Sequence, residues 1–346
     1  MSQLEAEQAE QPEALARLLD REGERVLALG RELAAGDPRL VVLAARGSSD
    51  NAARYAQYLL GVHNRLPVAL AAPSLDSVYR RPPLLHDALV VGVSQSGASP
   101  DILAVLEDAR AQGLPTVALT NSPDSPLGRA AEHVVPLHAG QERAVAATKT
   151  YVNALGALAL LSAGLEGDPG RLDALRRVPA ALAAAIEAGR AGARAAAEPL
   201  AAAAACAVVG RGFNYATAFE VALKVTELSG ILAAPFSGAD LLHGPIGAVD
   251  RGFPVVLVAP SGPALASLAE AARALRERGA VLVTVADDPG VLAAADAAIA
   301  LPPGLPEWLS PLVAVAPGQA LAVELARRRG RDLDHPAGLR KITTTR

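Results

Sequence analysis

The chain has 346 residues, of which 51% are hydrophobic and 20% are charged, and its formal net charge is −4 at pH 7. This composition excludes a disordered chain, and the length predicts two domains that can each bury a core. Because the chain has no long basic block and an aromatic content of only 3%, we expect no nucleic-acid partner.

Signals for secretion, membrane insertion and disulfide formation are absent from the sequence. No apolar run approaches the roughly 18 residues of a membrane span, and the acidic residues 1–15 are unlike a secretory signal peptide. The one cysteine, Cys206, excludes a disulfide framework and is expected to lie buried in a strand. The six histidines show no metal-ligand spacing. We therefore expect a cytoplasmic protein with no metal, no cofactor and no membrane partner.

Hydrophobic periodicity predicts an N-terminal helix followed by alternating strands and helices. The first helix spans residues 12–35, and its expected core positions are Leu15, Leu18, Leu19, Val26, Leu27 and Leu29. Strands are expected at 40–44, 68–71, 89–93, 116–119 and 133–137, and helices at 50–61, 99–112, 125–131 and 142–165. Since the strands are continuous apolar runs, they predict a parallel sheet covered on both faces.

The second half of the chain repeats the first at an offset of 165 residues, which is the separation of Gly47 from Gly212 and of Gly97 from Gly262. The same offset aligns residues 115–118 with 280–283 and residues 153–158 with 318–323. Matches of this kind indicate two copies of one α/β unit. We expect a duplicated, doubly wound fold with flavodoxin-like parallel sheets, joined by a helical segment.

A hydroxyl-rich loop, with the sequence SQSGAS at residues 94–99, follows the third predicted strand. Three hydroxyls and the N–H groups before a helix start predict a phosphate cradle, whereas N-capping by Ser99 would need only one hydroxyl. Ser48 and Ser49 follow the first strand, and ligands bind at strand carboxyl ends in such sheets. The second copy, with APSGP at residues 259–263, keeps only one of the three loop hydroxyls, so we expect one phosphate site per chain. Thr148 and Lys149 are either ligand contacts or a cap and a solvated charge.

A predicted helix in the second copy carries three charged residues on one face. Glu220, Lys224 and Glu227 occupy positions i, i+4 and i+7, so their side chains point the same way. His243 follows in the next segment of the chain. Taken alone, these residues are either a catalytic set or an exposed Glu–Lys pair worth about 0.3–0.5 kcal/mol.

From about residue 35 onward the chain resembles the sugar isomerase (SIS) domain family, and within it the isomerase half of the glutamine–fructose-6-phosphate aminotransferases. The motifs that carry the resemblance are Gly47-Ser48-Ser49, Ser94-Gln95-Ser96-Gly97, Glu142 with Val145-Ala146-Ala147-Thr148-Lys149, Glu220 with Lys224 and Glu227, His243-Gly244-Pro245, and the tail from Asp332 to Lys341. The resemblance implies an α/β protein of two tandem SIS domains, at residues 36–167 and 201–331. An N-terminal helix at 1–35, a helical linker at 168–200 and a tail at 332–346 complete the expected division.

The resemblance also implies which residues bind the substrate. A sugar phosphate would be held through its phosphate by Ser48, Ser49, Ser94, Gln95, Ser96 and Ser99. Val145 and Ala147 would line the sugar pocket, with Glu142 nearby.

The expected catalytic residues come from the second copy and the tail. By resemblance, Glu227 is the base that moves a proton between C1 and C2, while Lys224 and Glu220 position the open-chain sugar. His243, donated by the neighbouring subunit of a homodimer, would open the ring, and Lys341 would form a Schiff base with the ketose. Aldose–ketose chemistry requires a carboxylate base and an acid for ring opening, and a desolvated lysine can attack a carbonyl.

Three departures from the family pattern bear on the substrate. The sequence contains no glutaminase domain with its N-terminal cysteine nucleophile. Asp240 precedes His243 where the family commonly has glutamate, and Ala147 stands where serine is common. These departures leave the amino-group chemistry and the sugar contacts open.

We expect an enzyme that acts on an amino-sugar or ketose 6-phosphate. The expected reaction converts glucosamine 6-phosphate to fructose 6-phosphate and ammonia, or runs in the reverse direction with ammonia. Two related activities stay open, an aminotransferase-type isomerase subunit and a deglycase of fructosamine phosphates. The alternative outside catalysis is a sugar-phosphate sensor, which would need only the phosphate loops, so Glu227, His243 and Lys341 together favour an enzyme.

Overall fold

A computed structural model describes residues 1–341 of the chain, which forms two compact units. The N-terminal unit comprises Glu10–Glu142, Lys149–Arg177 and the tail residues Arg340 and Lys341. The C-terminal unit comprises Met1–Ala9, Arg143–Thr148 and Val178–Leu339.

The N-terminal unit is built on a five-stranded parallel sheet with the strand order β2-β1-β3-β4-β5. Its central strand β3 is buried along its whole length, as expected of a strand covered on both faces. The strands are β1 (Leu40–Ala44), β2 (Val68–Leu70), β3 (Ala88–Val93), β4 (Thr116–Thr120) and β5 (His133–Pro136). The prediction of five parallel strands is confirmed in this half of the chain.

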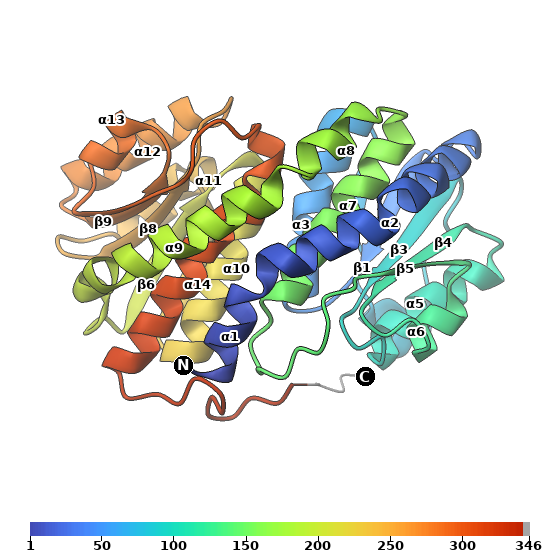
Figure 1. Ribbon diagram of the computed structural model, residues 1–346, viewed down its shortest axis with the longest axis horizontal. Helices are drawn as coiled ribbons and strands as arrows, with labels where there is room; N and C mark the ends of the chain where they lie inside the picture. The colour runs from blue at the N-terminus through green and yellow to red at the C-terminus, as the bar shows by residue number, and fades with distance from the viewer. Residues whose placement is uncertain (342–346) are drawn as a thin grey trace. The chain divides into compact units, whose positions relative to one another are not determined.

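Helices cover both faces of this sheet (Figure 1). Helix α2 crosses α7 where Gly30 meets Gly164, and a Cβ on Gly30 would lie 2.6 Å from the backbone of Gly164. On the other side, Ile102 and Leu106 of α5 pack against Val90 in one apolar cluster. The helices are α2 (Gln11–Ala35), α3 (Ser48–Leu59), the π-helical turn η1 (Leu60–Asn64), α4 (Ser74–Ser77), α5 (Pro100–Ala111), α6 (Pro126–Ala130), α7 (Lys149–Glu166) and α8 (Gly170–Leu175).

The C-terminal unit repeats the same architecture with the strand order β10-β9-β8-β6-β7. Read from the other edge, this is the order of the first sheet, and all its strands are again parallel. The strands are β6 (Ala205–Gly210), β7 (Leu232–Ser237), β8 (Pro254–Ala259), β9 (Val281–Ala286) and β10 (Ala297–Ala300). Since β6 starts 165 residues after β1, and β9 starts 165 residues after β4, the predicted duplication is confirmed.

Helices α9, α10 and α14 lie side by side in the C-terminal unit (Figure 1). Helix α9 packs on α14 as α2 packs on α7, with Gly189 against Pro317 at the crossing. The segment predicted to join the two copies therefore contributes a helix to the second copy. The helices are α1 (Gln3–Ala9), α9 (Val178–Ala197), η2 (Glu198–Leu200), η3 (Gly212–Asn214), α10 (Tyr215–Ser229), α11 (Gly238–Leu242), η4 (Pro245–Ala248), α12 (Leu265–Glu277), α13 (Pro289–Ala293), η5 (Glu307–Leu309) and α14 (Pro311–Arg328).

One predicted helix starts later than expected. The sequence predicts a helix over residues 142–165, but α7 begins at Lys149. Residues 142–148 form a loop with bends rather than a helix. The side chain of Glu7 accepts the N–H groups of Arg143 and Ala144, while Glu142 accepts the N–H of Thr150. The carboxylates of Glu7 and Glu142 thus bond N–H groups at the two ends of this non-helical segment.

One simpler expectation is confirmed. Cys206 is 1% exposed in β6, where burial raises the pKa of its thiol to about 12. No helix in the described part of the chain is long and apolar enough to cross a membrane.

Candidate functional site

The predicted phosphate loop follows β3 and leads into α5. At its centre Gly97 has a φ of 61°, and a Cβ at this position would lie 1.9 Å from Ser125 Oγ, so only glycine fits. The N–H of Leu127 donates to the Gly97 carbonyl at 3.0 Å. The loop is therefore held in shape by the segment around α6.

The serine side chains of this loop support its turn. Ser94 Oγ accepts the N–H of Gly97 at 3.2 Å, and Ser96 Oγ accepts the N–H of Ala98 at 3.3 Å. Each hydroxyl keeps its own proton, which it can donate to an anion. Ser99 occupies the N-cap position of α5, but its hydroxyl makes no capping hydrogen bond. The simpler interpretation of Ser99 as a side-chain cap is therefore wrong.

Ser48 and Ser49 lie in the first turn of α3, directly after β1. Because β1 and β3 are neighbours from which the chain crosses to opposite edges of the sheet, this is the switch point where such folds bind ligands. Arg46 Nε donates to the fully buried carboxylate of Asp101 at 2.8 Å, which joins this loop to the start of α5. Ser48 and Ser49 are half-buried.

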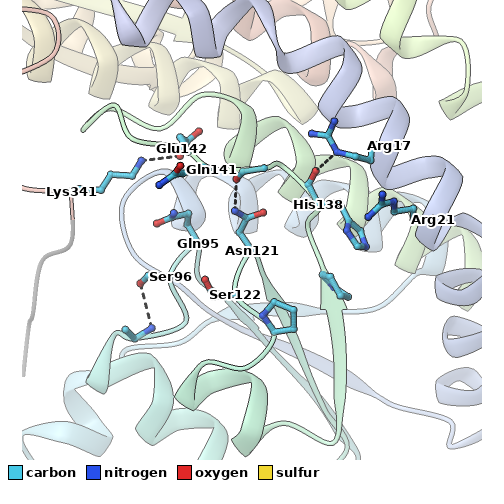
Figure 2. Close-up of a pocket in the computed structure, with 14 residues that line it drawn as sticks. Arg17, Arg21, Gln95, Ser96, Asn121, Ser122, His138, Gln141, Glu142 and Lys341 are labelled. Atoms are coloured by element: carbon cyan, nitrogen blue, oxygen red, sulfur yellow. Dashed lines mark hydrogen bonds and ion pairs between the residues drawn. The ribbon is translucent and has the colours of Figure 1, made fainter.

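A cavity of about 800 Å³ opens beside the cradle in the N-terminal unit (Figure 2). Four predicted site residues line it: Gln95, Ser96, Glu142 and Lys341. The remaining lining comes from helix α2, the loop after β3, the end of β5 and the loops after β4 and β5, namely Arg17, Arg21, Ala98, Asn121, Ser122, Pro123, Pro136, His138, Gly140 and Gln141. The cavity thus lies at the carboxyl ends of three neighbouring strands.

Lys341 reaches this cavity from the tail and meets Glu142 there. Lys341 Nζ lies 2.9 Å from Glu142 Oε2, and the Glu142 side chain is fully buried, while that of Lys341 is 23% exposed. Glu142 Oε2 also accepts the hydroxyl of Thr150 at 2.6 Å. A primary amine is therefore held at the cavity by a fixed carboxylate.

Six polar residues of the lining were not predicted from the sequence, namely Arg17, Arg21, Asn121, Ser122, His138 and Gln141. Asn121 Nδ2 donates to the Gly140 carbonyl at 2.8 Å, and Arg17 Nε donates to the His138 carbonyl at 2.9 Å. Figure 2 shows Arg17, Arg21 and His138 on the side of the cavity away from Lys341. Ligands in such sheets bind at the carboxyl ends of the strands, which is how the serine loop was predicted. Asn121 and His138 follow β4 and β5, so the same rule could have predicted them. The arginines of α2 carry no such signal.

The charged residues of α10 form a buried cluster in the C-terminal unit. Lys224 and Glu220 are 1% and 0% exposed, and Lys224 Nζ lies 3.5 Å from Glu220 Oε1. Lys224 Nζ also donates to Glu227 Oε2 at 2.6 Å, and the Glu227 side chain is 23% exposed. Charged side chains are almost never fully buried unless they are paired, because burial costs them their hydration. The interpretation of this helix face as an exposed ion pair is therefore wrong.

His243, Val145 and Ala147 also lie in the C-terminal unit. His243 is exposed at the end of α11, and its ring makes no hydrogen bond or ion pair within residues 1–341. Val145 and Ala147 are half-buried and alternate with buried neighbours. No hydrogen bond or ion pair joins these side chains to Glu227 within residues 1–341. Their roles stay predictions.

Thr148 and Lys149 were expected to be either ligand contacts or a cap and a solvated charge, and the structure decides part of this question. Both residues are buried, and Lys149 Nζ pairs with Glu10 Oε2 at 2.5 Å. Lys149 is therefore not a solvated charge. Its ammonium is occupied by Glu10, at the junction between α1 and α2.

In the second copy, one of the protein's own carboxylates fills the place of the cradle. Gly262 corresponds to Gly97 at the offset of 165 residues, and Glu307 corresponds to Glu142 at the same offset. A Cβ on Gly262 would lie 2.4 Å from a carboxylate oxygen of Glu307, whose carboxylate accepts the N–H of Ala264. The Glu307 carboxylate thus accepts a loop N–H group that could otherwise donate to a phosphate. This arrangement supports the prediction of one phosphate site per chain.

Glu307→Gln is expected to stabilise the fold more at pH 8 than at pH 4. Burial raises the pKa of the Glu307 carboxyl above its ordinary value of 4.5, despite the opposing hydrogen bond from Ala264. Because the folded protein binds this proton more tightly than the unfolded chain does, the carboxyl group favours folding below pH 4.5. This contribution to the free energy of unfolding is lost as the pH rises through the pKa of Glu307 in the folded protein. Thermal unfolding of wild type and variant at both pH values measures the effect. Glu270→Gln, on the exposed side of α12, is the control. A Glu307→Gln variant that is less stable than wild type by the same amount at pH 4 and at pH 8 would contradict the assignment.

Comparison with known proteins identifies the family of this chain. A model of the SIS domain matches residues 37–163 and again residues 200–326. A glutamine–fructose-6-phosphate aminotransferase (isomerizing) of Zymomonas mobilis is 34% identical over 315 residues, which cover 88% of this chain but 52% of that protein. The chain thus spans about half the length of the curated relatives that it matches.

Two solved structures match nearly the whole chain. A candidate phosphosugar isomerase of Silicibacter pomeroyi DSS-3 has a TM-score of 0.85 and 36% identity, over 96% of this chain and 100% of that one. The C-terminal domain of glucosamine-fructose-6-phosphate aminotransferase of Francisella tularensis has a TM-score of 0.85 and 25% identity, over 97% and 98% of the two chains. With two matched segments and two matching parallel sheets, the chain belongs to the SIS domain family.

Proposed function

We propose that the protein is a sugar-phosphate aldose–ketose isomerase that also deaminates, converting glucosamine 6-phosphate to fructose 6-phosphate and ammonia or running the reverse reaction. One observation carries the proposal. A single cavity combines the serine loop at Ser96 with the amine of Lys341, which the buried Glu142 holds. The names of the relatives support it, since they are aminotransferases of fructose 6-phosphate and a candidate phosphosugar isomerase.

The first role is substrate binding. We assign the phosphate to the loop hydroxyls at the N-terminal ends of α5 and α3, where helix dipoles favour an anion. The residues concerned are Ser48, Ser49, Ser94, Gln95, Ser96 and Ser99. Val145 and Ala147 would contact the sugar carbons.

The second role is proton transfer along the open-chain sugar. His243 of a partner subunit protonates the ring oxygen as the C1 hydroxyl loses its proton, which opens the ring to the aldehyde. Glu227 then removes the proton on C2, which carries the amine, and the electron pair forms a C1=C2 double bond while the aldehyde oxygen takes up a proton from solvent. Glu227 returns its proton to C1 as the nitrogen lone pair forms a C2=N bond, which leaves a protonated imine at C2. Lys224 lies 2.6 Å from Glu227 and holds the base in place. Glu220 in turn pairs with Lys224.

The third role is release of the amino group. The neutral amine of Lys341 adds to the C2 imine, ammonia leaves, and a Schiff base between Lys341 and the sugar forms. Water then hydrolyses the Schiff base to the ketone and returns the amine. Glu142, 2.9 Å from Lys341 Nζ, can accept the proton that the ammonium must lose before it attacks.

The experiment that tests the function is a substrate panel. The protein is incubated with amino-sugar 6-phosphates, ketose 6-phosphates and fructosamine phosphates, and both ammonia and the isomerised sugar are measured. We expect glucosamine 6-phosphate to give equal amounts of ammonia and fructose 6-phosphate. Binding of these compounds without any product would instead identify a sensor, and release of an amine from a fructosamine phosphate alone would identify a deglycase.

Ser96→Ala is expected to weaken binding of hexose 6-phosphates by about tenfold to a hundredfold, because a hydrogen bond to a charged group contributes about 1.5–3 kcal/mol. Calorimetric titration with fructose 6-phosphate measures the change. Ser261→Ala, at the corresponding position of the second copy, is the matched control and should bind as wild type does. Unchanged affinity in Ser96→Ala would show that the cradle is misplaced.

A further inference from the structure

Helix α1 carries a carboxylate that is completely buried and bonded to backbone groups outside its own helix. Glu7 is 0% exposed, and its Oε1 accepts the N–H of Arg143 at 2.6 Å. The N–H of Ala144 lies 3.2 Å from Oε2 and 3.4 Å from Oε1. Gln3, one turn earlier on α1, also donates to Oε1, at 2.9 Å. A buried carboxylate with three donors is a fixed structural element, because loss of these bonds would leave polar groups unpaired.

The segment that Glu7 holds, residues 143–148, contains two of the proposed sugar contacts. Its burial alternates, with Ala144, Ala146 and Thr148 at 0–2% exposure and Val145 and Ala147 half-buried between them. Bends at residues 144–146 and 148 shape the segment, and the carboxylate of Glu7 anchors its first two N–H groups. The bonds to Glu7 therefore fix the start of the segment, and with it which residues face outward.

The other end of α1 is bound by the C-terminal tail. Asp334 accepts the N–H of Gln3 through Oδ2 and the N–H of Leu4 through Oδ1, both at 3.1 Å. These are first-turn N–H groups that have no partner inside the helix. Leu4 and Leu333 are both buried. Helix α1 thus links the tail, seven residues before Lys341, to the segment 143–148.

We propose that Glu7 is a positioning residue, which fixes residues 143–148 so that Val145 and Ala147 face the sugar, and that α1 transmits the state of the tail at Asp334 to this segment. The proposal rests on the proposed function for the identity of the ligand. Its structural part concerns only contacts within the C-terminal unit.

The first test measures the segment directly by hydrogen–deuterium exchange of the full-length protein. Glu7→Gln should raise the exchange of amides 143–148 at least tenfold, since the amide side chain accepts these N–H groups more weakly than a carboxylate does. Asp334→Ala, which removes the carboxylate that accepts the N–H groups of Gln3 and Leu4, should also raise exchange in this segment. Glu5→Gln is the matched control, because Glu5 on the same helix pairs instead with Arg327 at 2.6 Å. Unchanged exchange in Glu7→Gln overturns the proposal, whatever the protein binds.

The second test separates positioning from general damage. Glu7→Gln should weaken binding of fructose 6-phosphate tenfold or more but leave binding of inorganic phosphate unchanged, since the cradle does not involve this segment. Equal losses for both ligands would mean that the variant is merely less folded, and that result would overturn the positioning role. If the wild-type protein binds phosphate but no hexose phosphate, the proposed function fails, while the exchange result still decides the role of Glu7.

Discussion

Glu227→Gln is expected to lower kcat by a factor of about 10²–10⁴, the range that a positioned general base contributes. The substitution keeps the size of the side chain and an oxygen that can accept from Lys224, which now donates at 2.6 Å. It removes only the ability to take the C2 proton. The KM for glucosamine 6-phosphate should change little, because the phosphate and sugar contacts belong to other residues. Steady-state kinetics with ammonia release as the readout measures both constants.

The pH profile gives this prediction a second readout. Loss of a general base removes the acidic limb of the kcat/KM profile, since that limb reports protonation of the base in the free enzyme. Glu187→Gln, in an exposed ion pair of α9 in the same unit, is the control and should keep the wild-type profile. If Glu227→Gln retains most of the activity with its acidic limb intact, another group is the base.

The fold could be predicted from the sequence because its signals are local. Continuous apolar runs such as residues 89–93 indicated parallel strands, and the offset from Gly47 to Gly212 indicated the duplication. The serine loop was found for the same reason, since Ser94 and Ser96 follow a strand and precede a helix within a few residues. Positions that depend on one short segment of chain can be read from that segment.

The features that sequence analysis missed depend on contacts between distant segments. The start of α7 was misplaced because the side chain of Glu7 takes N–H groups more than a hundred residues away. Arg17 on α2 lines the cavity, but helical periodicity identified only the buried face of that helix. The burial of Lys224 was also open at first, because the spacing of its helix face is the same for an exposed pair. Spacing determines which residues share a face, and only packing determines what covers it.

Lys224→Met is expected to lower the free energy of unfolding by about 3–5 kcal/mol, the usual cost of removing one partner from a buried ion pair. The side-chain volume is nearly kept, but Glu220, which is 0% exposed, loses its ion pair at 3.5 Å. Denaturant unfolding measures the loss. Arg190→Met breaks an exposed pair in the same unit, with side chains 41% and 71% exposed, and should cost no more than about 1 kcal/mol.

A double variant shows why this cluster is in the protein. Lys224→Met combined with Glu220→Gln removes both buried charges, and it should recover much of the stability that the single variant loses, because a buried pair is often no more stable than neutral residues of similar volume. The double variant should nevertheless be poorly active, since Glu227 then has no ammonium beside it. Recovered stability with lost turnover would mean that the buried charges serve the reaction rather than the fold. A single variant as stable as wild type would instead show that the α10 cluster is solvated, and would remove the physical argument for a preorganised base at Glu227.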